Sequence, residues 1–398
     1  MCSLDALAEE TKIQGRLQNR TGFRLDNDQT RSLSDNLAQI ELQQPIGTWE
    51  IKAIGRARRE SDLEPEVYRE AELRELTLRQ RAENYTLTLG RQQVVWGRTD
   101  GLRVLDLVNP LDMREFILDD YSDSRIPLWM VNAEWFIGKQ TLQVLVIPDI
   151  KQNRAAEYGG EYYIAPDLPM NVPVSTAPTR TPAKTLANSE YAARWGGRAG
   201  QWDLAGIYFY GWGDTPVPFT QLEAGPSLLV SPEVRRQRVF GLSGDRPIGP
   251  TVFRFEVSAS PDSYQSVATA DGGNRFVRHD IIRYAFGVDW LVNNWLLSSQ
   301  IFHENIRNPQ AGLTGDDSRN FFTLLISHKW LQDRLGARLF YVYGPEHRDE
   351  WFAPRLSYDF FGRLELRIGA DFFDGKPSGL FGQFADRDRI VLEAILRF

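Results

Sequence analysis

The sequence has no long hydrophobic runs. None of its segments approaches the roughly 18 consecutive apolar residues that a membrane-spanning helix needs, because Arg, Asp or Asn interrupts each aromatic-rich run within a few positions. This pattern excludes a helical membrane protein. It does not exclude a transmembrane β-barrel, because the strands of such barrels alternate polar and apolar side chains and do not stand out in averaged hydropathy.

Cysteine and histidine are scarce. The single cysteine, Cys2, excludes an internal disulfide framework and any cysteine-based metal cluster. It is interpreted either as a lipidated residue or as a remnant left by cloning. The four histidines, at positions 279, 303, 328 and 347, show neither metal-ligand spacing nor a nearby nucleophile motif. We therefore expect no metal, no cofactor and no enzymatic activity.

The net charge of −7 gives no support for nucleic-acid binding, where a basic patch is the usual footprint. Only seven of the 46 basic residues are Lys, so the remaining 39 are Arg. Arginine suits a packed network of ion pairs, because its planar guanidinium stays charged when crowded. A GC-rich genome explains the same bias equally well.

Apolar and polar residues alternate with a period of two along most of the chain, as in a strand with two different faces. In the last ten residues, RIVLEAILRF, one face carries Ile390, Leu392 and Leu396, and the other carries Arg389, Glu393 and Arg397. Taken alone, this ending also fits an edge strand of a soluble sandwich. The repeated segments, however, are about as long as the 9 to 11 residues that a tilted strand needs to cross a bilayer.

The connections between these segments alternate between short and long. Short turns are predicted at residues 45–48, 82–85, 137–140, 197–201, 247–251, 292–295, 332–336 and 360–363. Longer links fall between them, so the sequence predicts an all-β, antiparallel, up-and-down transmembrane barrel of about 18 strands. Such barrels have short periplasmic turns and long external loops. A soluble propeller also uses many short strands, but no blade-length repeat is visible.

The predicted barrel domain spans residues 12–398 and follows an N-terminal extension at residues 1–11. The N-terminus, MCSLDALAEETK, lacks the features of a secretory signal, so we expect that an export signal has been removed. A long external loop is predicted at residues 150–189, either folded over the mouth or extended at the surface. Aromatic girdles are expected at Trp49, Tyr85, Trp96, Trp129, Trp202, Trp295, Trp330 and Trp351.

The inner wall of this barrel is predicted to be rich in basic side chains. The candidate pore-lining residues are Arg16, Arg20, Arg24, Lys52, Arg56, Arg58, Arg79, Arg254, Arg283, Arg338, Arg355, Arg363, Arg367, Arg389 and Arg397.

Residues 98–127 form a candidate constriction loop. The segment stops alternating, contains a turn signal at Asn109–Pro110, and is long for a simple connection. Its carboxylates are Asp106, Asp112, Glu115, Asp119, Asp120 and Asp123. If the loop folds inward, these groups face the basic wall and either orient charged solutes or pair with the arginines and close the channel.

The segments GRQQVVWG (90–97), VNPLD (108–112) and SRIPLWMVNAEW (124–135) resemble the motif region of an uncharacterised porin-like family of Gram-negative outer-membrane proteins. This family is distantly similar to alginate-export-type and other eighteen-stranded channels. The motif residues are Gly90, Arg91, Gln92, Trp96, Gly97, Asn109 and Pro110. The resemblance implies an outer-membrane location and a channel-like body, and it brings no substrate or catalytic residues.

The sequence thus predicts an outer-membrane channel for small polar or anionic solutes. A transporter or structural partner for lipids, working with periplasmic machinery, is the alternative, and a barrel hydrolase is a third possibility. The expected partners are outer-membrane lipid, the barrel-assembly machinery and a small-molecule solute. The terminal aromatic Phe398 resembles the signal that outer-membrane proteins present to that machinery.

Overall fold

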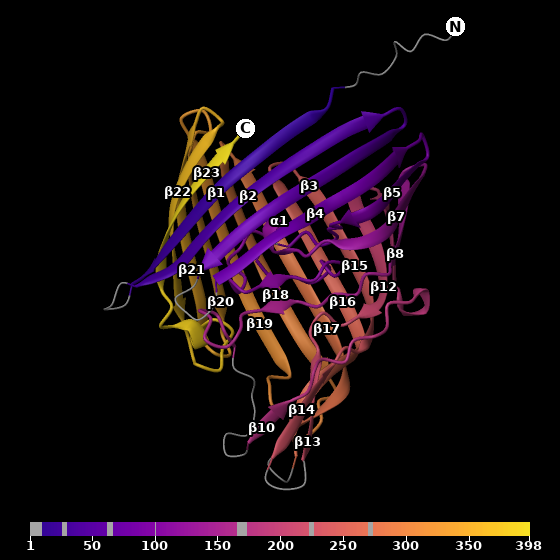
Figure 1. Ribbon diagram of the computed structural model, residues 1–398, viewed down its shortest axis with the longest axis vertical. Coiled ribbons are helices and arrows are strands. Elements are labelled where there is room, and N and C mark those ends of the chain that lie inside the picture. Colours follow the sequence, from indigo (N-terminus) through magenta and orange to yellow (C-terminus); the bar gives the residue numbers. More distant parts are fainter. Residues whose placement is uncertain are drawn as a thin grey trace.

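Eighteen antiparallel strands form one closed sheet (Figure 1). The computed structural model describes residues 10–25, 30–61, 67–99, 101–164, 173–222, 227–269 and 274–398. Each barrel strand pairs with the next one along the chain, and the last pairs with the first. The predicted fold class and strand number are therefore confirmed. Cys2 and most of the predicted N-terminal extension lie outside the described residues.

The first half of the wall contains nine strands. They are β1 (Lys12–Arg24), β2 (Arg31–Ile46), β3 (Trp49–Ser61), β4 (Val67–Arg81), β5 (Tyr85–Gln92), β7 (Leu128–Ile137), β8 (Gln140–Ile147), β11 (Glu190–Ala199) and β12 (Trp202–Trp212).

The second half also contains nine strands. They are β15 (Arg236–Ile248), β16 (Thr251–Ala268), β17 (Asn274–Val292), β18 (Trp295–Arg307), β19 (Ser318–Trp330), β20 (Leu335–Gly344), β21 (Asp349–Phe360), β22 (Leu364–Asp374) and β23 (Arg389–Arg397).

A few short elements lie in the loops. Strands β6 (Asp112–Met113) and β9 (Arg154–Ala155) pair in parallel, and β10 (Val174–Thr176), β13 (Val217–Leu222) and β14 (Leu228–Glu233) form a three-stranded sheet. The helical pieces are α1 (Tyr121–Ser124), η1 (Leu186–Asn188) and η2 (Gly382–Phe384). Within the described part of the chain, no helix is long and apolar enough to cross a membrane.

The two ends of the barrel differ. The eight predicted short turns all join neighbouring strands at one end, where the C-terminus and the start of β1 also lie (Figure 1). We call this the short-turn end. Asn293 and Asn294, which join β17 to β18, take the positive φ angles that tight hairpins require. The three-stranded sheet lies at the opposite, long-loop end.

The period-two alternation separates the two faces of the wall. In β17, Ile281 and Ala285 are buried on the inner face, whereas Phe286 and Trp290 are exposed on the outer face. Trp129, Trp295 and Trp330 are likewise exposed, as expected for a girdle. The expectation was wrong for Trp96 and Trp351, which are 3% and 7% exposed and pack inside the barrel.

The barrel closes at the pairing of β1 with β23. Register runs from Arg16 opposite Arg397 to Arg24 opposite Arg389. Beyond the last strand, the Phe398 amide donates to the Gly15 carbonyl at 3.0 Å, and the Gly15 amide donates to the Phe398 carbonyl at 2.7 Å. The Phe398 ring covers Gly15 and fills the space that a side chain at this position would need.

Deletion of Phe398 should reduce the fraction of chains that assemble. The deletion removes the final pair of backbone hydrogen bonds at the seam and the ring that covers Gly15. Heat-modifiable gel mobility measures the folded fraction. Phe361→Ala is the matched control, because Phe361 is 84% exposed in a turn away from the seam. Normal assembly of the truncated chain would contradict this assignment.

Candidate functional site

The described residues between β5 and β7, 93–99 and 101–127, run through the interior of the barrel and are called the inward loop. Trp96 and Leu105 belong to a buried apolar cluster with Leu145, Ile207 and Phe302 of the wall. Other members of this cluster come from β7, β11, β15 and β17. The first part of the inward loop is thus held to one side of the barrel by apolar contacts.

The second part of the inward loop reaches another portion of the wall. Phe116 is 3% exposed and packs with Phe340 of β20, Trp351 of β21 and Phe373 of β22. Tyr162, from the loop after β8, stacks on Phe116 with ring centroids 6.3 Å apart. The inward loop therefore crosses the lumen, as the unusual length of this connection suggested.

Asn109 of the motif joins the two ends of the inward loop. Its side chain is 0% exposed. The carboxamide oxygen accepts from the Val94 amide at 2.8 Å, and the carboxamide nitrogen donates to the Ile126 carbonyl at 2.9 Å. The neighbouring Pro110 carbonyl accepts from the Ile126 amide at 2.7 Å. These bonds hold the start and the end of the inward loop side by side.

The other motif residues fit the inward loop to the wall. Trp96 donates its indole N–H to the Gln143 side chain of β8 at 2.7 Å. Gly97 lies so close to Asp106 that a Cβ atom there would be 2.8 Å from the Asp106 Cβ. Gly90 has a φ of 124° and lies against the β4 backbone. Arg91 pairs with Glu72 at 2.9 Å, and Gln92 accepts from Asn132 at 3.3 Å.

Three carboxylates of the inward loop pair with arginines of the wall. Asp119 binds Arg20 at 2.6 Å and Arg58 at 3.1 Å. Asp123 lies 2.7 Å from Arg16 and 3.9 Å from Arg56.

The third carboxylate, Glu115, binds Arg389 at 2.7 Å. Arg74 of β4 donates to three carbonyls of the inward loop, those of Ser122, Asp123 and Arg125, at 2.7 to 2.9 Å. The side of the lumen formed by β23, β1, β3 and β4 thus holds the inward loop by ionic contacts.

The remaining three predicted carboxylates do not reach wall arginines. Asp106 pairs with Arg125 at 2.8 Å, within the inward loop itself. Asp112 pairs with Arg114 at 2.5 Å. Asp120 is exposed and borders an open part of the lumen.

Arginines of the wall lower the pKa values of Asp119 and Asp123 in the inward loop. Burial alone would raise the pKa of Asp119, but the guanidinium groups of Arg20 and Arg58 outweigh it and hold that pKa well below the ordinary range. The pKa of Asp123 is also lowered, because Arg16 outweighs the effect of burial. Both groups are therefore ionised at neutral pH.

The structure places the predicted basic residues on the inner side of the wall, mostly beside carboxylates. Representative pairs are Arg24–Glu161 at 2.5 Å, Lys52–Glu75 at 3.1 Å, Arg79–Glu50 at 3.6 Å, Arg283–Glu304 at 2.5 Å, Arg355–Asp371 at 2.5 Å, Arg367–Glu393 at 3.1 Å and Arg397–Glu365 at 2.7 Å. Arg254 pairs with Asp289. Arg338 borders a lumenal cavity, whereas Arg363 lies in the exposed turn before β22 rather than within a strand.

A lumenal cavity of about 410 Å³ separates the inward loop from the wall. Asp119, Asp120 and Asp123 border it on the loop side. Arg338 and Arg367 border it on the wall side. The wall side also carries carboxylates such as Asp35, Glu365 and Glu393, so charges of both signs line the cavity.

A second cavity, of about 730 Å³, lies at the short-turn end and is called the cationic cavity here. Its lining includes Arg98, Lys139, Arg194 and Arg198, against one carboxylate, Asp203. Within the described chain, the buried Nε atom of Arg194 has no hydrogen-bond partner. The sequence analysis missed this cluster, although the four-residue spacing of Arg194 and Arg198 on one strand places both on the same face.

The predicted external loop at 150–189 lies partly inside the barrel. Glu161 is 5% exposed and binds Arg24 of β1 at 2.5 Å. Tyr162 is buried beside Phe116. Further along, β10 joins the three-stranded sheet at the long-loop end. Part of this loop therefore supports the inward loop, and another part belongs to the sheet at the long-loop end.

His347 lies between a serine and an aspartate, a contact that the sequence did not predict. Ser378 Oγ is 3.0 Å from Nδ1 of His347, and Asp316 is 2.5 Å from its Nε2. Hydrolysis by such a set also needs amides free to bind an oxyanion. The nearby amides of Leu380, Phe381 and Gly382 all donate to Asp349 instead.

The sequence of residues 56–398 matches a family model described as "Protein of unknown function (DUF1302)". The chain belongs to this family. A search of curated proteins finds no match.

Solved structures of similar fold include several porins of Pseudomonas aeruginosa. OccK8 (OprE) superposes with a TM-score of 0.56 at 13% identity, covering 98% of each chain. OpdK with vanillate has a TM-score of 0.55 at 11% identity, covering 98% of this chain and 99% of that one. OccK2 (OpdF) in complex with glucuronate has a TM-score of 0.54 at 10% identity, covering 98% and 96%. At these identities the likeness concerns the fold of this DUF1302 member.

Asn109→Ala should loosen the inward loop. The substitution leaves the Val94 amide and the Ile126 carbonyl without their partner, and an unsatisfied buried group costs roughly 1–3 kcal/mol. Proteolytic cleavage within residues 93–127 should accelerate by about tenfold or more. Asn188→Ala, which removes an exposed hydrogen bond to the Ala183 carbonyl, is the matched control. Equal cleavage of both variants would contradict the role of Asn109.

Low pH should weaken the ion pairs that join Asp119 and Asp123 of the inward loop to the arginines of the wall. A carboxylate whose pKa is lowered by folding stabilises the folded form above its unfolded pKa, about 3.9 for Asp, and this contribution is lost as the pH falls through the folded value. Channel conductance should therefore begin to rise below about pH 4 and continue to rise as the pH falls toward the lowered pKa values of Asp119 and Asp123. Asp119→Asn should produce part of the rise at neutral pH, and Asp120→Asn, at an exposed position, should not. A conductance that stays constant from pH 4 down to the lowest pH at which the barrel remains folded would refute this account.

Proposed function

We propose that this protein is an outer-membrane channel for small anionic or polar solutes. A closed barrel of 18 strands with a loop folded into its lumen supports this function. The porins OccK8, OccK2 and OpdK share this overall fold. In the orientation that such barrels adopt, the short-turn end faces the periplasm and the long-loop end faces outward.

The observation that carries the proposal is the cationic cavity. Arg98 pairs there with Asp245, whereas Lys139, Arg194 and Arg198 form no ion pair among the described residues. The Nε atom of Arg194 is buried without a partner in the same part of the chain. Elsewhere on the inner wall, most arginines are neutralised by neighbouring carboxylates, as Arg367 is by Glu393 at 3.1 Å. An anion in the cationic cavity would supply the missing acceptor, because charge-assisted hydrogen bonds to carboxylates are a preferred role of arginine.

A carboxylate-bearing solute fits this arrangement. Glucuronate and vanillate, the ligands in the structures of OccK2 and OpdK, each carry one carboxylate. We propose the same chemical class for this chain. The inward loop acts as the constriction, and the charged walls of the 410 Å³ cavity orient the solute during passage. The basic residues of the inner wall form the lining of the pathway.

The partners follow from this location. Outer-membrane lipid surrounds the apolar outer face, and Phe398 is presented to the barrel-assembly machinery. A periplasmic transport partner would approach at the short-turn end, where the cationic cavity lies.

Arg194→Gln combined with Arg198→Gln should weaken anion binding in the channel. In planar bilayers, block of chloride current by glucuronate should need roughly tenfold more ligand, since a hydrogen bond to a charged group contributes about 1.5–3 kcal/mol. The chloride-to-potassium permeability ratio should also fall.

Arg79→Gln is the matched control, because Arg79 already faces Glu50 at 3.6 Å. Absence of conductance from well-folded wild-type protein would refute the open channel. An unchanged block in the double variant would refute the assignment of the cationic cavity.

A further inference from the structure

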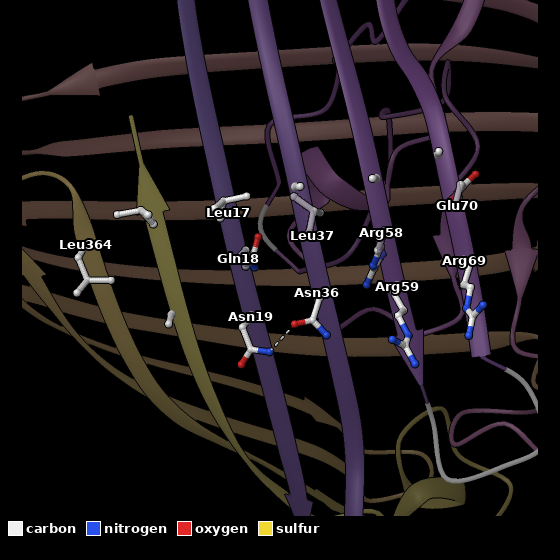
Figure 2. Close-up of a pocket in the computed structure, with 15 residues that line it drawn as sticks. Leu17, Gln18, Asn19, Asn36, Leu37, Arg58, Arg59, Arg69, Glu70 and Leu364 are labelled. Atoms are coloured by element: carbon white, nitrogen blue, oxygen red, sulfur yellow. Dashed lines mark hydrogen bonds between the residues drawn. The ribbon is translucent and has the colours of Figure 1, made fainter.

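A shallow hollow lies on the outer face of the barrel, over β23 and β1 to β4 (Figure 2). Its volume is about 740 Å³. Most of the outer wall carries large apolar side chains such as Phe286, Ile301 and Leu392. The hollow is different, because small and polar residues replace the large ones. A membrane-facing surface of this kind needs a physical reason, since burying polar groups in hydrocarbon is costly.

Four polar residues form a row across the strands at this hollow. Asn19 lies opposite Asn36, Asn36 opposite Arg59, and Arg59 opposite Arg69. Figure 2 shows these side chains one beside the next, with the Asn19 Nδ2 atom donating to the Asn36 Oδ1 atom at 2.8 Å. The adjacent Arg58 points the opposite way and binds Asp35 on the inner face at 2.9 Å.

Arg59 and Arg69 form a cross-strand pair of like charges. Such a pair is repulsive unless an anion neutralises it. Among the described residues, no carboxylate lies within ion-pair distance of either guanidinium. Glu70 also borders the hollow, but it binds Arg154 at 2.8 Å. The arginine pair therefore presents two donor groups outward that the described wall does not neutralise.

Two other arginines on the outer face of the barrel do have a carboxylate partner. Arg238 of β15 and Arg278 of β17 are also exposed, and they share one carboxylate, that of Asp262, at 2.6 and 3.4 Å. The wall thus supplies a counter-charge to one outward arginine pair and not, in its described part, to the other.

The surface beside the arginine pair is apolar and consists mainly of small side chains. The next row across the strands consists of Leu17, Ala38, Ala57 and Ala71, each opposite its neighbour. Three consecutive alanines leave the space that forms the hollow. Hydrocarbon would cover this surface favourably, because it buries apolar area without displacing a polar group.

The arginine pair lies near one end of its strands. Arg59 is two residues before the end of β3, and Arg69 is two residues after the start of β4, both at the long-loop end. In the orientation proposed above, this end faces outward. The guanidinium groups then lie at the level of the lipid headgroups of the outer leaflet, and the alanine row lies alongside their acyl chains.

We propose that Arg59 and Arg69 bind the phosphate group of an outer-leaflet lipid, whose acyl chain lies over Ala38, Ala57 and Ala71. Two guanidinium groups match the charge and the multiple acceptors of a phosphate, and Asn19 and Asn36 offer further amide contacts. A second copy of the chain fits less well, because a twofold contact would bring this cationic row against itself.

This inference relies on the proposed membrane location and is independent of conduction. Wild-type protein reconstituted with phosphatidylethanolamine and lipid A, a phosphorylated glycolipid, should retain lipid A through mild detergent extraction. Mass spectrometry of the intact protein measures the retained fraction. Arg59→Gln combined with Arg69→Gln should lower it by about tenfold, while heat-modifiable mobility and conductance stay unchanged.

Arg238→Gln combined with Arg278→Gln is the matched control. It removes the same number of outward arginines at a place where Asp262 already neutralises them, and retention should stay at the wild-type level. Ala57→Trp is a second test, because it keeps both arginines and fills the hollow, and it should also lower retention of lipid A.

Three results would overturn the proposal. Equal retention by the wild type and the Arg59/Arg69 variant would exclude a role of the arginine pair. Full retention by Ala57→Trp together with displacement by inorganic phosphate would show a simple anion site. Cross-linked dimers that depend on Arg59 and Arg69 in the absence of lipid A would assign the surface to a second copy of the chain.

Discussion

The structure depends on the satisfaction of backbone hydrogen bonds around a closed sheet. In hydrocarbon, an unpaired N–H or C=O costs several kcal/mol, so a sheet can cross a membrane only when its last strand pairs with its first. Here that pairing joins β23 to β1 and extends to Gly15 and Phe398. Because the backbone hydrogen bonds of the wall are made between its own strands, the side chains on its two faces are free to differ. The inner face holds the inward loop, and the outer face carries most of the exposed apolar side chains.

The inner face is itself divided into two parts. From β7 to β18 and from β20 to β22 the wall meets the inward loop with apolar side chains such as Leu145 and Phe340. Along β23, β1, β3 and β4 it meets the loop with arginines such as Arg20 and Arg389. Both contacts bury the loop, but they respond to different conditions. Apolar packing is indifferent to pH, whereas ion pairs weaken when Asp119 or Asp123 takes up a proton.

The fold was predictable from the sequence because only the closure of β23 on β1 joins strands that are distant along the chain. Each strand pairs with its neighbour along the chain, so period-two alternation and turn spacing define most of the barrel. The same parity rule, applied strictly, would have placed Trp351 on the inner face with Ala353 and Arg355. It would also have found Arg194 and Arg198. The partners of the lumenal charges were not predictable, since no local rule specifies that Asp119 meets Arg20 or that Glu115 meets Arg389, 274 positions away.

Asn109 determines where the inward loop is attached to the wall. It ties Val94 to Ile126, so both ends of the loop leave the wall from one place, between β5 and β7. Apolar packing against β7 to β18 and β20 to β22 holds most of the loop. The arginines of β1, β3 and β4, close to the strand where the loop begins, hold residues 119–125. Of these contacts, only the ionic ones depend on the charge of Asp119 and Asp123. Passage through the barrel would therefore open along the β1 to β4 wall, beneath the same strands whose outer face carries Arg59 and Arg69.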